Sequence, residues 1–280
     1  MNIGIVGQGF VGSAIWKGLK TFHDIETYDI NSAISSCNSL KEVVDYGHII
    51  FVCLPTPMKL STGECDIDLV QQTVLTIDKL AETNKIVVIK STVPPGTTAV
   101  LDRQTKIVDV IFNPEFLTEA NSFEDFKNQT RIIIGGSRPA TSVVKTMFRK
   151  AFPTVPIVKT GSRTAEMVKY FTNCFLATKV TFANELYQIC KTLEVDYDKV
   201  VEYSLYDERI GRTHLAVPGP DGDFGFGGHC FPKDLAALKY VANQHLIDTT
   251  ILHAVETKNR MVRINEDWIG MIGRAVSEEK

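Results

Sequence analysis

The sequence predicts an α/β fold in which a doubly wound parallel sheet is followed by an all-helical region. Up to about Pro156, short apolar runs alternate with longer polar–apolar stretches, the pattern of strands joined by crossover helices. Residues 162–194 contain no proline or glycine and repeat apolar residues at helical spacing. A glycine-rich turn follows the first apolar run directly, as at the start of many nucleotide-binding sheets.

The strands of the first region are predicted from short β-rich runs. Several are apolar throughout, as expected for parallel strands buried on both faces. The predicted strands are residues 2–6, 25–29, 48–54, 85–89, 107–112 and 131–134. The intervening segments are long enough for crossover helices, the first of them at 13–19. Residues 1–160 are therefore expected to form one domain.

The second domain is expected at residues 161–280 and to be helical. The helix at 162–194 is long for a globular interior, so it is expected to bridge two parts or to pack against another subunit. A glycine-rich loop, VPGPDGDFGFGGHCFP (217–232), fits neither a regular helix nor a strand. Residues 233–244 and 248–263 are predicted as two further helices.

Composition excludes several classes of protein. The 280 residues are 44% hydrophobic and 22% charged, which is typical of a folded protein rather than a disordered or fibrous one. The net charge of −3 gives no reason to expect a nucleic-acid partner. No apolar run approaches the roughly 20 residues of a membrane helix. A membrane association is therefore not expected.

The N-terminus and the cysteines predict a cytoplasmic protein. The first residues, MNIGIVGQGF, lack the basic region of a secretory signal and begin with strand-like residues. The six cysteines form no CxxC pair. This pattern favours reduced thiols over a disulfide framework or a metal site.

A G-x-G-x-x-G motif, Gly7 to Gly12, predicts a dinucleotide site. A predicted strand precedes it, a helical run follows it, and an acid, Asp29, ends the next strand. The glycines of this motif, Gly7, Gly9 and Gly12, permit the turn and close approach of the pyrophosphate, and Phe10 and Val11 lie between them. Asp29 would accept hydrogen bonds from the adenosine ribose and repel a 2′-phosphate. NAD is therefore favoured over NADP.

Five further motifs occur in a fixed order along the chain. They are CLPTP (53–57), STVPPGT (91–97), NPEFLTE (113–119), AEMVKYFTN (165–173) and GFGGHCFPKD (225–234). Together they resemble the UDP-glucose/GDP-mannose dehydrogenase family, whose first domain is of the Rossmann type. The resemblance implies NAD-dependent, four-electron oxidation of the primary alcohol of a nucleotide sugar to a carboxylate. UDP-glucose, oxidised to UDP-glucuronate, is the substrate it implies first.

Cys230 is the first candidate for catalysis. It precedes Pro232, a favoured first-turn residue, so it should lie at a helix N-terminus near Lys233, where a thiolate is stabilised. The glycines before it, Gly227 included, are expected to clear space for the thiol and for substrate. The resemblance assigns Cys230 as the nucleophile that captures the aldehyde. Asp234 is either a helix N-terminal acid or, by resemblance, a group that orients water or a catalytic amine.

Lys169 and Asn173 are four residues apart and so share one face of the predicted long helix. An exposed lysine is the ordinary expectation for such a position. The resemblance instead assigns Lys169 to stabilising the developing alkoxide, with Asn173 beside it. Both are also expected to contact the substrate.

Asn113 and Pro114 predict an N-cap and first-turn proline, with Glu115 and Glu119 on one short helix. Exposed first-turn acids that stabilise the helix dipole are the simpler interpretation. By resemblance, Glu119 acts on the water that hydrolyses a thioester. The remaining residues of the motif, Glu115, Phe116 and Leu117, would then hold substrate.

Three more residues are assigned by resemblance. Thr92 ends a strand at the edge where an open α/β sheet places its ligands, and it would bind water or substrate near the nicotinamide. Thr56 would contact the cofactor. Arg209 resembles an arginine that reaches the substrate of the neighbouring subunit. The long apolar helix at 162–194 correspondingly predicts a homodimer.

Two other functions remain open. A two-electron β-hydroxyacid dehydrogenase has a similar length and a Lys-x-x-x-Asn pair, here Lys169 and Asn173, but needs no cysteine. A non-catalytic relic that binds a nucleotide sugar is the other.

Full-length members of the family continue into a second Rossmann-like domain that has no counterpart in these residues, and the loop before Cys230 carries a PGPDG insertion. Half of the uridine-diphosphate pocket is therefore expected either to be missing or to be supplied by another chain.

Overall fold

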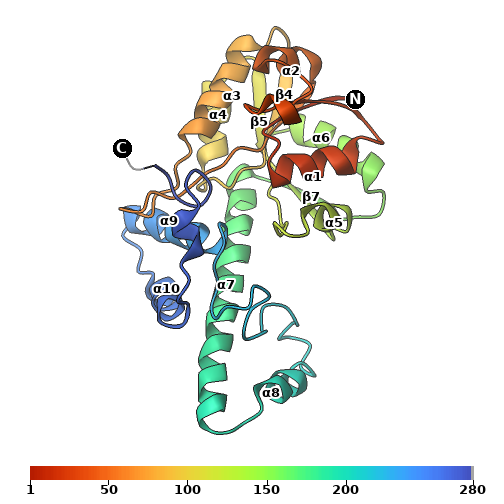
Figure 1. Cartoon of the computed structure of the whole chain (residues 1–280). Helices are drawn as coiled ribbons and strands as arrows, with labels where there is room; N and C mark the ends of the chain where they lie inside the picture. Colours follow the sequence, from red (N-terminus) through yellow and green to blue (C-terminus); the bar gives the residue numbers. More distant parts are fainter. Residues whose placement is uncertain (279–280) are drawn as a thin grey trace. The chain divides into compact units, whose positions relative to one another are not determined.

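A computed structural model describes residues 1–278 of the chain, which folds into two compact units. Unit 1 comprises Met1–Thr56 and Asp66–Lys169. Unit 2 comprises Pro57–Cys65 and Tyr170–Lys280. The helices and strands of both units are labelled in Figure 1.

Unit 1 contains a seven-stranded sheet with the strand order β2-β1-β3-β4-β5-β6-β7. All neighbouring strands are parallel except β5 and β6, which pair antiparallel. The strands are β1 (Asn2–Val6), β2 (Asp24–Tyr28), β3 (Ile49–Val52), β4 (Lys85–Ile89), β5 (Val108–Phe112), β6 (Ile132–Gly135) and β7 (Ile157–Thr160). The six expected strands are confirmed to within two residues at either end. The seventh, β7, was not expected because it lies after the proline at which the strand pattern of the sequence ends.

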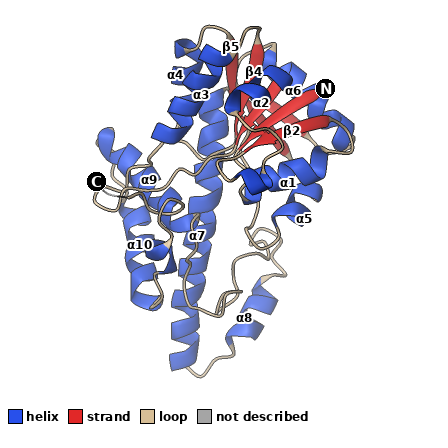
Figure 2. Ribbon diagram, turned by 45° about the horizontal axis from the view of Figure 1, so that its top comes forward, coloured by secondary structure: helices blue, strands red, loops and turns tan. Residues whose placement is uncertain are grey.

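Helices cover both faces of this sheet, which is the doubly wound arrangement (Figure 2). On one face lie α1 (Phe10–Leu19), α5 (Ser122–Lys127) and α6 (Ala140–Ala151). On the other lie α2 (Leu40–Tyr46), α3 (Asp68–Leu80) and α4 (Thr97–Gln104). A short 3₁₀ helix, η1 (Ser32–Ile34), follows β2.

The alternation along β3 shows why these strands must be apolar throughout. Ile49 and Phe51 pack into the core under α1 and α6, whereas Ile50 and Val52 pack into the core under α2 and α3. All four side chains are fully buried. Burying each stabilises the fold by roughly 1.5–3 kcal/mol, so neither face of the strand can be polar.

Unit 2 is built from helices. The 31-residue helix α7 (Ser162–Thr192) begins in unit 1 and continues from Tyr170 in unit 2. It is followed by α8 (Tyr197–Ser204), α9 (Phe231–Gln244), α10 (Thr250–Val262) and the 3₁₀ helix η2 (Asp267–Gly270). The long helix and both later helices are confirmed, with ends one or two residues from those expected, whereas α8 was not expected.

The segment Pro57–Cys65 lies in unit 2 although it follows β3 directly in the chain. Met58 forms a parallel β-bridge with Val276 and packs against Trp268 and Ala275. The Met58 backbone N–H donates to the Ala275 carbonyl oxygen at 2.8 Å. The end of the described chain therefore completes a small core with residues from its first quarter.

The expected short helix at residues 113–119 does not form. Residues 113–118 are irregular, and the next helix, α5, begins at Ser122. Asn113 does not cap a helix, because its amide Nδ2 donates to the Ile133 carbonyl at 2.6 Å. The Glu115 carboxylate accepts the Leu117 N–H at 2.7 Å and so folds the chain back within two residues. These side-chain bonds to the backbone replace the helical ones.

Within the described residues, no helix is both long and apolar enough to cross a membrane.

Candidate active site

The glycine-rich turn after β1 has the geometry that a pyrophosphate needs. Gly7 adopts a φ of +91°, and a Cβ on Gly12 would lie 1.9 Å from the Gly7 carbonyl oxygen, so neither position tolerates a side chain. Gly9 is the N-cap of α1 and brings no capping side chain. Apart from Gly9, its chain neighbours and the adjoining helix backbone, no described atom lies within 4 Å of the place where a Cβ on Gly9 would be, which leaves this helix end open to an anion. Phe10 and Val11 form the first turn of α1.

Asp29 closes the same turn from the end of β2. Its Oδ2 accepts the Gln8 backbone N–H at 2.7 Å, and its Oδ1 accepts the Asn31 N–H at 2.9 Å. The carboxylate is half-buried and retains lone pairs that a ribose hydroxyl could meet. The turn and the carboxylate together fit the adenosine diphosphate half of a dinucleotide.

The loops that follow β3 and β4 are tied together at the same edge of the sheet. The Thr56 hydroxyl donates to the Thr92 carbonyl at 2.8 Å, and the Ser91 hydroxyl donates to the Leu54 carbonyl at 2.6 Å. Both threonines are buried. Because the strands are parallel, this edge is their carboxyl end, where open α/β sheets bind ligands.

Lys169 and Glu115 form a buried ion pair in unit 1. Lys169 Nζ lies 2.7 Å from Glu115 Oε1 and also donates to the Glu115 carbonyl at 2.8 Å. Only 4% of the lysine side chain and 7% of the glutamate side chain are exposed. Burial alone would raise the pKa of Glu115, but the Lys169 ammonium and the Leu117 N–H hold it below its ordinary value. Lys169 is therefore not the exposed lysine that would ordinarily be expected at such a position.

Lys90 is a second buried cation beside this pair, and sequence reasoning missed it. It follows the last residue of β4, and its Nζ donates to Asn113 Oδ1 at 2.9 Å. Burial lowers the pKa of Lys90 to about 8; the nearby Cys53 and Glu115 oppose this shift, and Lys169 adds to it. Lys90 and Glu115 line a cavity of about 250 Å³ with Phe116 and Leu117. A charged residue directly after an apolar strand was the only sequence signal.

Glu166 was also missed, although it belongs to the AEMVKYFTN motif. It is fully buried, and its two carboxylate oxygens accept the Gly96 N–H at 2.6 Å and the Thr98 N–H at 2.8 Å. These are amides at the N-terminus of α4, where a negative charge is stabilised. Glu166 thereby fixes the end of the STVPPGT loop that carries Thr92.

In unit 2, Cys230 is the N-cap residue of α9 and Pro232 lies in the first turn, as expected. The Asp234 N–H donates to the Cys230 carbonyl at 3.0 Å. Lys233 and Asp234 form a buried ion pair in this turn. Burial would lower the pKa of Lys233, but Asp234 and the thiols of Cys65 and Cys230 raise it well above its ordinary value. The helix end and this ammonium both favour negative charge on sulfur.

Asn173 joins this turn to α7. Its amide Nδ2 donates to Asp234 Oδ2 at 2.6 Å, and both side chains are buried. Asp234 therefore accepts from Lys233 through one oxygen and from Asn173 through the other. Lys169 lies one turn before Asn173 on the same helix.

Three of the other cysteines, Cys37, Cys53 and Cys174, have the properties of inert thiols. All six lie in the described part of the chain, and none of them forms a disulfide. Burial raises the pKa of Cys53 to about 12 and raises the pKa of Cys174 further. Burial and the neighbouring Glu26 also raise the pKa of Cys37. These thiols carry little thiolate near neutral pH.

Three further expected site residues lie in turns and loops of their units. Glu119 is exposed, in the turn that precedes α5. Arg209 is exposed in the loop after α8, where its guanidinium pairs with Asp207. At Gly227 the close approach is made by the protein itself, because a Cβ there would lie 2.3 Å from Arg263 Nη2.

Comparison with known proteins identifies the family. Residues 30–152 match the NAD-binding domain of the UDP-glucose/GDP-mannose dehydrogenase family, and residues 163–261 match its central domain. The chain belongs to this family. It is a family of nucleotide-sugar dehydrogenases, and NAD is the cofactor that its first domain binds. Gly7, Gly9, Gly12 and Asp29 are the residues whose geometry fits it here.

Members of the family from bacteria and archaea are similar over most of this chain. The UDP-glucose 6-dehydrogenase of Rickettsia conorii is 36% identical over 298 residues, which cover 93% of this chain and 67% of that protein. TuaD of Bacillus subtilis, a UDP-glucose 6-dehydrogenase, is 33% identical over 86% of this chain, which spans about half (52%) of TuaD. The structure of a UDP-glucose dehydrogenase from Pyrobaculum islandicum is 29% identical, with a TM-score of 0.83, covering 93% of this chain and 68% of that one.

Proposed function

We propose that the protein oxidises the primary alcohol of a nucleotide sugar to a carboxylate in two steps, with UDP-glucose as the first candidate substrate. The observation that carries this proposal is Cys230 at the N-terminus of α9, next to Lys233. An enzyme that stopped at a two-electron oxidation would need no such thiol. Residues 1–160 would act as the NAD-binding domain and residues 161–280 as the domain that carries the nucleophile.

The first step removes a hydride and a proton from the alcohol. NAD, when bound, accepts the hydride in this step and again in the later oxidation. Lys169 and Asn173, one turn apart on α7, would stabilise the oxygen as negative charge develops on it. Glu115 keeps the Lys169 ammonium in place through two contacts. Thr56 and Thr92 would line the cofactor side, and Phe116 and Leu117 the substrate side.

Cys230 then captures the aldehyde. Its thiolate sulfur forms a bond to the carbonyl carbon, and the carbonyl oxygen takes a proton to give a thiohemiacetal. Loss of a second hydride and the hydroxyl proton converts this adduct to a thioester. A free aldehyde would otherwise escape from an open site, so capture keeps the intermediate on the enzyme.

Water finally cleaves the thioester. Its oxygen bonds to the acyl carbon, the C–S bond breaks, and Cys230 leaves as the thiolate. Glu119 would take the proton from this water, with Asp234 and Thr92 positioning it. The overall balance is one alcohol, two NAD⁺ and one water giving one carboxylate, two NADH and three protons.

The proposal is tested by a panel of UDP-glucose, GDP-mannose and UDP-N-acetylhexosamines, with NADH followed by absorbance. We expect UDP-glucose to give the fastest turnover and two NADH for each sugar nucleotide consumed. The matched control omits the sugar nucleotide but keeps NAD and enzyme. No NADH from any member of the panel, with NAD binding intact, would support a non-catalytic nucleotide-sugar binder instead.

Cofactor choice depends on Asp29. We expect NAD to support far faster turnover than NADP, because the carboxylate at the end of β2 repels a 2′-phosphate. Asp29→Ala should narrow this ratio by about tenfold, which corresponds to about 1.4 kcal/mol of repulsion removed. The ratio of kcat/KM for the two cofactors measures the change, and equal use of both by the unaltered protein would contradict it.

We also propose that the protein is a homodimer through α7, with Arg209 of one subunit contacting the substrate of the other. Three phenylalanines, Phe171, Phe175 and Phe182, are 68%, 56% and 58% exposed on this helix. Exposed aromatic rows of this kind usually mark a protein interface. Phe175→Asp should give a monomer in light scattering, whereas Lys191→Asp, a polar position of the same helix, should remain dimeric. A fully active monomer of the unaltered chain would exclude this interface.

We also propose that the protein works in the cytoplasm, where thiols are kept reduced.

A further inference from the structure

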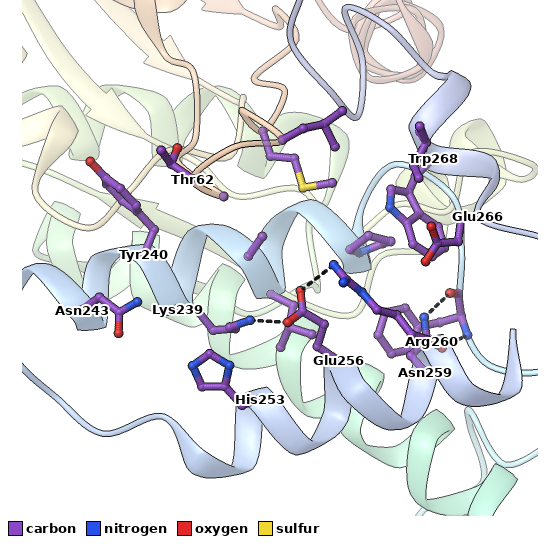
Figure 3. Close-up of a pocket in the computed structure, with 18 residues that line it drawn as sticks. Thr62, Lys239, Tyr240, Asn243, His253, Glu256, Asn259, Arg260, Glu266 and Trp268 are labelled. Atoms are coloured by element: carbon purple, nitrogen blue, oxygen red, sulfur yellow. Dashed lines mark hydrogen bonds and ion pairs between the residues drawn. The ribbon is translucent and has the colours of Figure 1, made fainter. Parts of the chain in front are cut away.

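The backbone that leads to Cys230 is held by the side chain of Asn259 on α10. Asn259 Oδ1 accepts the Phe226 N–H at 2.8 Å, and its Nδ2 donates to the Phe226 carbonyl at 2.9 Å. Figure 3 shows Asn259 making both bonds. The side chain is buried, so these bonds are not exchanged with water. Both backbone polar groups of Phe226 are therefore hydrogen-bonded, as they would be to a neighbouring β-strand.

Asp267 holds the next part of the same segment. Its Oδ2 accepts the Gly228 N–H at 3.0 Å, two residues before Cys230, and its Oδ1 accepts from Arg263 Nη2 at 3.0 Å. Arg263 is thus joined to the cysteine loop through one carboxylate. Charge-assisted bonds of this kind are about twice as strong as neutral ones.

Arg263 is itself fixed on several sides. Its side chain is only 1% exposed, and its Nη1 donates to Asp221 Oδ2 at 2.9 Å. Its Nε donates to the Asn265 carbonyl at 2.7 Å, and Asp223 lies 3.6 Å from Nη2. The guanidinium is buried although its carboxylate partners are partly exposed, so moving Arg263 away from them would leave a buried charge unpaired.

The glycines of the GFGGHC segment leave room for these side chains. A Cβ on Gly225 would lie 2.3 Å from Asn259 Oδ1, and a Cβ on Gly227 would lie 2.2 Å from Asp267 Oδ1. Both distances are too short for any side chain. The space beside Gly225 and Gly227 is therefore not empty. It is filled by the side chains of Asn259 and Asp267, which hold the loop.

We propose that Asn259, Arg263 and Asp267, here called the loop clamp, are positioning residues that hold Cys230 where it intercepts the aldehyde. The inference rests on the proposed function, because it concerns the thiol steps of that reaction. Capture competes with escape of the aldehyde, so the position of the sulfur decides how much intermediate is retained. A misplacement of about 1 Å can slow such a step by about a hundredfold.

The loop clamp is tested with Asp267→Ala, Asp267→Asn and Asn259→Ala in the full chain. Glu256→Ala is the matched control: it lies on α10, and its carboxylate pairs with Lys239 of α9 and Arg260 of α10 (Figure 3). The first measurement is NADH formed per UDP-glucose, with released aldehyde trapped by an aminooxy reagent. The second is the rate at which iodoacetamide labels Cys230, followed by peptide mapping, which needs neither NAD nor substrate.

We expect Asp267→Ala and Asn259→Ala to lower the yield from two NADH toward one and to release trapped aldehyde. Labelling of Cys230 should change by about tenfold, while Glu256→Ala matches the unaltered protein. Asp267→Asn keeps an acceptor for Gly228 and should recover most of the yield even if Asp267→Ala does not fold. Folded variants with unchanged yield and unchanged labelling would overturn the loop clamp. One NADH from the unaltered protein would refute the proposed function instead, and the labelling rates would still decide the loop clamp.

Discussion

Cys230→Ala should abolish the second NADH and permit at most the first. Without the sulfur no thiohemiacetal can form, so the second hydride has no covalent adduct to leave from. Net oxidation to the carboxylate should fall by several orders of magnitude, while the first hydride transfer depends on Lys169 and Asn173. A single-turnover experiment that counts NADH and traps the aldehyde measures both quantities.

Cys190→Ala is the matched control for this experiment. Cys190 is a half-buried thiol of α7 that packs against the cluster of Ala183, Tyr197 and Val217. The Cys190→Ala variant should give two NADH per sugar nucleotide, like the unaltered protein. A yield of one NADH that Cys230→Ala leaves unchanged would favour the two-electron hydroxyacid reaction. That outcome would leave Lys169 and Asn173 in place as the catalytic pair.

Lys169→Met should lower kcat by about 10²–10³-fold, the loss of roughly 3–4 kcal/mol that removal of one charge-stabilising donor produces in other enzymes. It should also destabilise the fold by about 3–5 kcal/mol, because the buried Glu115 carboxylate loses its partner. The two effects are separated by Lys169→Met combined with Glu115→Gln. This double variant should regain stability in urea but not activity.

The pH dependence of unfolding checks the same pair. In the unaltered protein the pKa of Glu115 is lowered in the fold, so its stabilisation is present above its unfolded pKa, about 4.3, and is lost as the pH falls. In Lys169→Met burial dominates and raises that pKa, so stability should rise as the pH falls from about 7 to 5. The activity measurement remains separate from the unfolding measurement. If the variant that combines Lys169→Met with Glu115→Gln regained activity, the role of Lys169 would be structural only.

Six of the seven strands of unit 1 were predictable, because most of them are apolar runs that the local sequence defines. The helix expected at Asn113 failed because Asn113 and Glu115 bind the backbone and Lys169 instead of capping a helix. Local propensity cannot show this, since Lys169 lies 54 residues further along the chain. The decisive interaction exists only in the folded unit.

The candidate site shows the same division. The position of Cys230 at a helix N-terminus followed from one proline and its neighbours, which are local signals. Lys90, Glu166 and Arg263 are charged residues that composition places on a surface, and each is buried. Their burial depends on partners distant in sequence, such as the 70 residues between Gly96 and Glu166. The glycines of the loop were expected to leave space around Cys230. That Asn259 and Asp267 occupy the space beside two of these glycines could be seen only in the folded structure.

The detour of residues Pro57–Cys65 into unit 2 has a consequence for how the chain folds during synthesis. Met58 and Ser277 are bonded across 219 residues, so this part of unit 2 cannot close until nearly all of the described chain has left the ribosome. Until then the apolar side of Met58 lacks Trp268, Ala275 and Val276 and remains open to water and to aggregation. A fragment cut after Lys169 would leave Met58 in that state permanently, so the two units are not separable by a single cut.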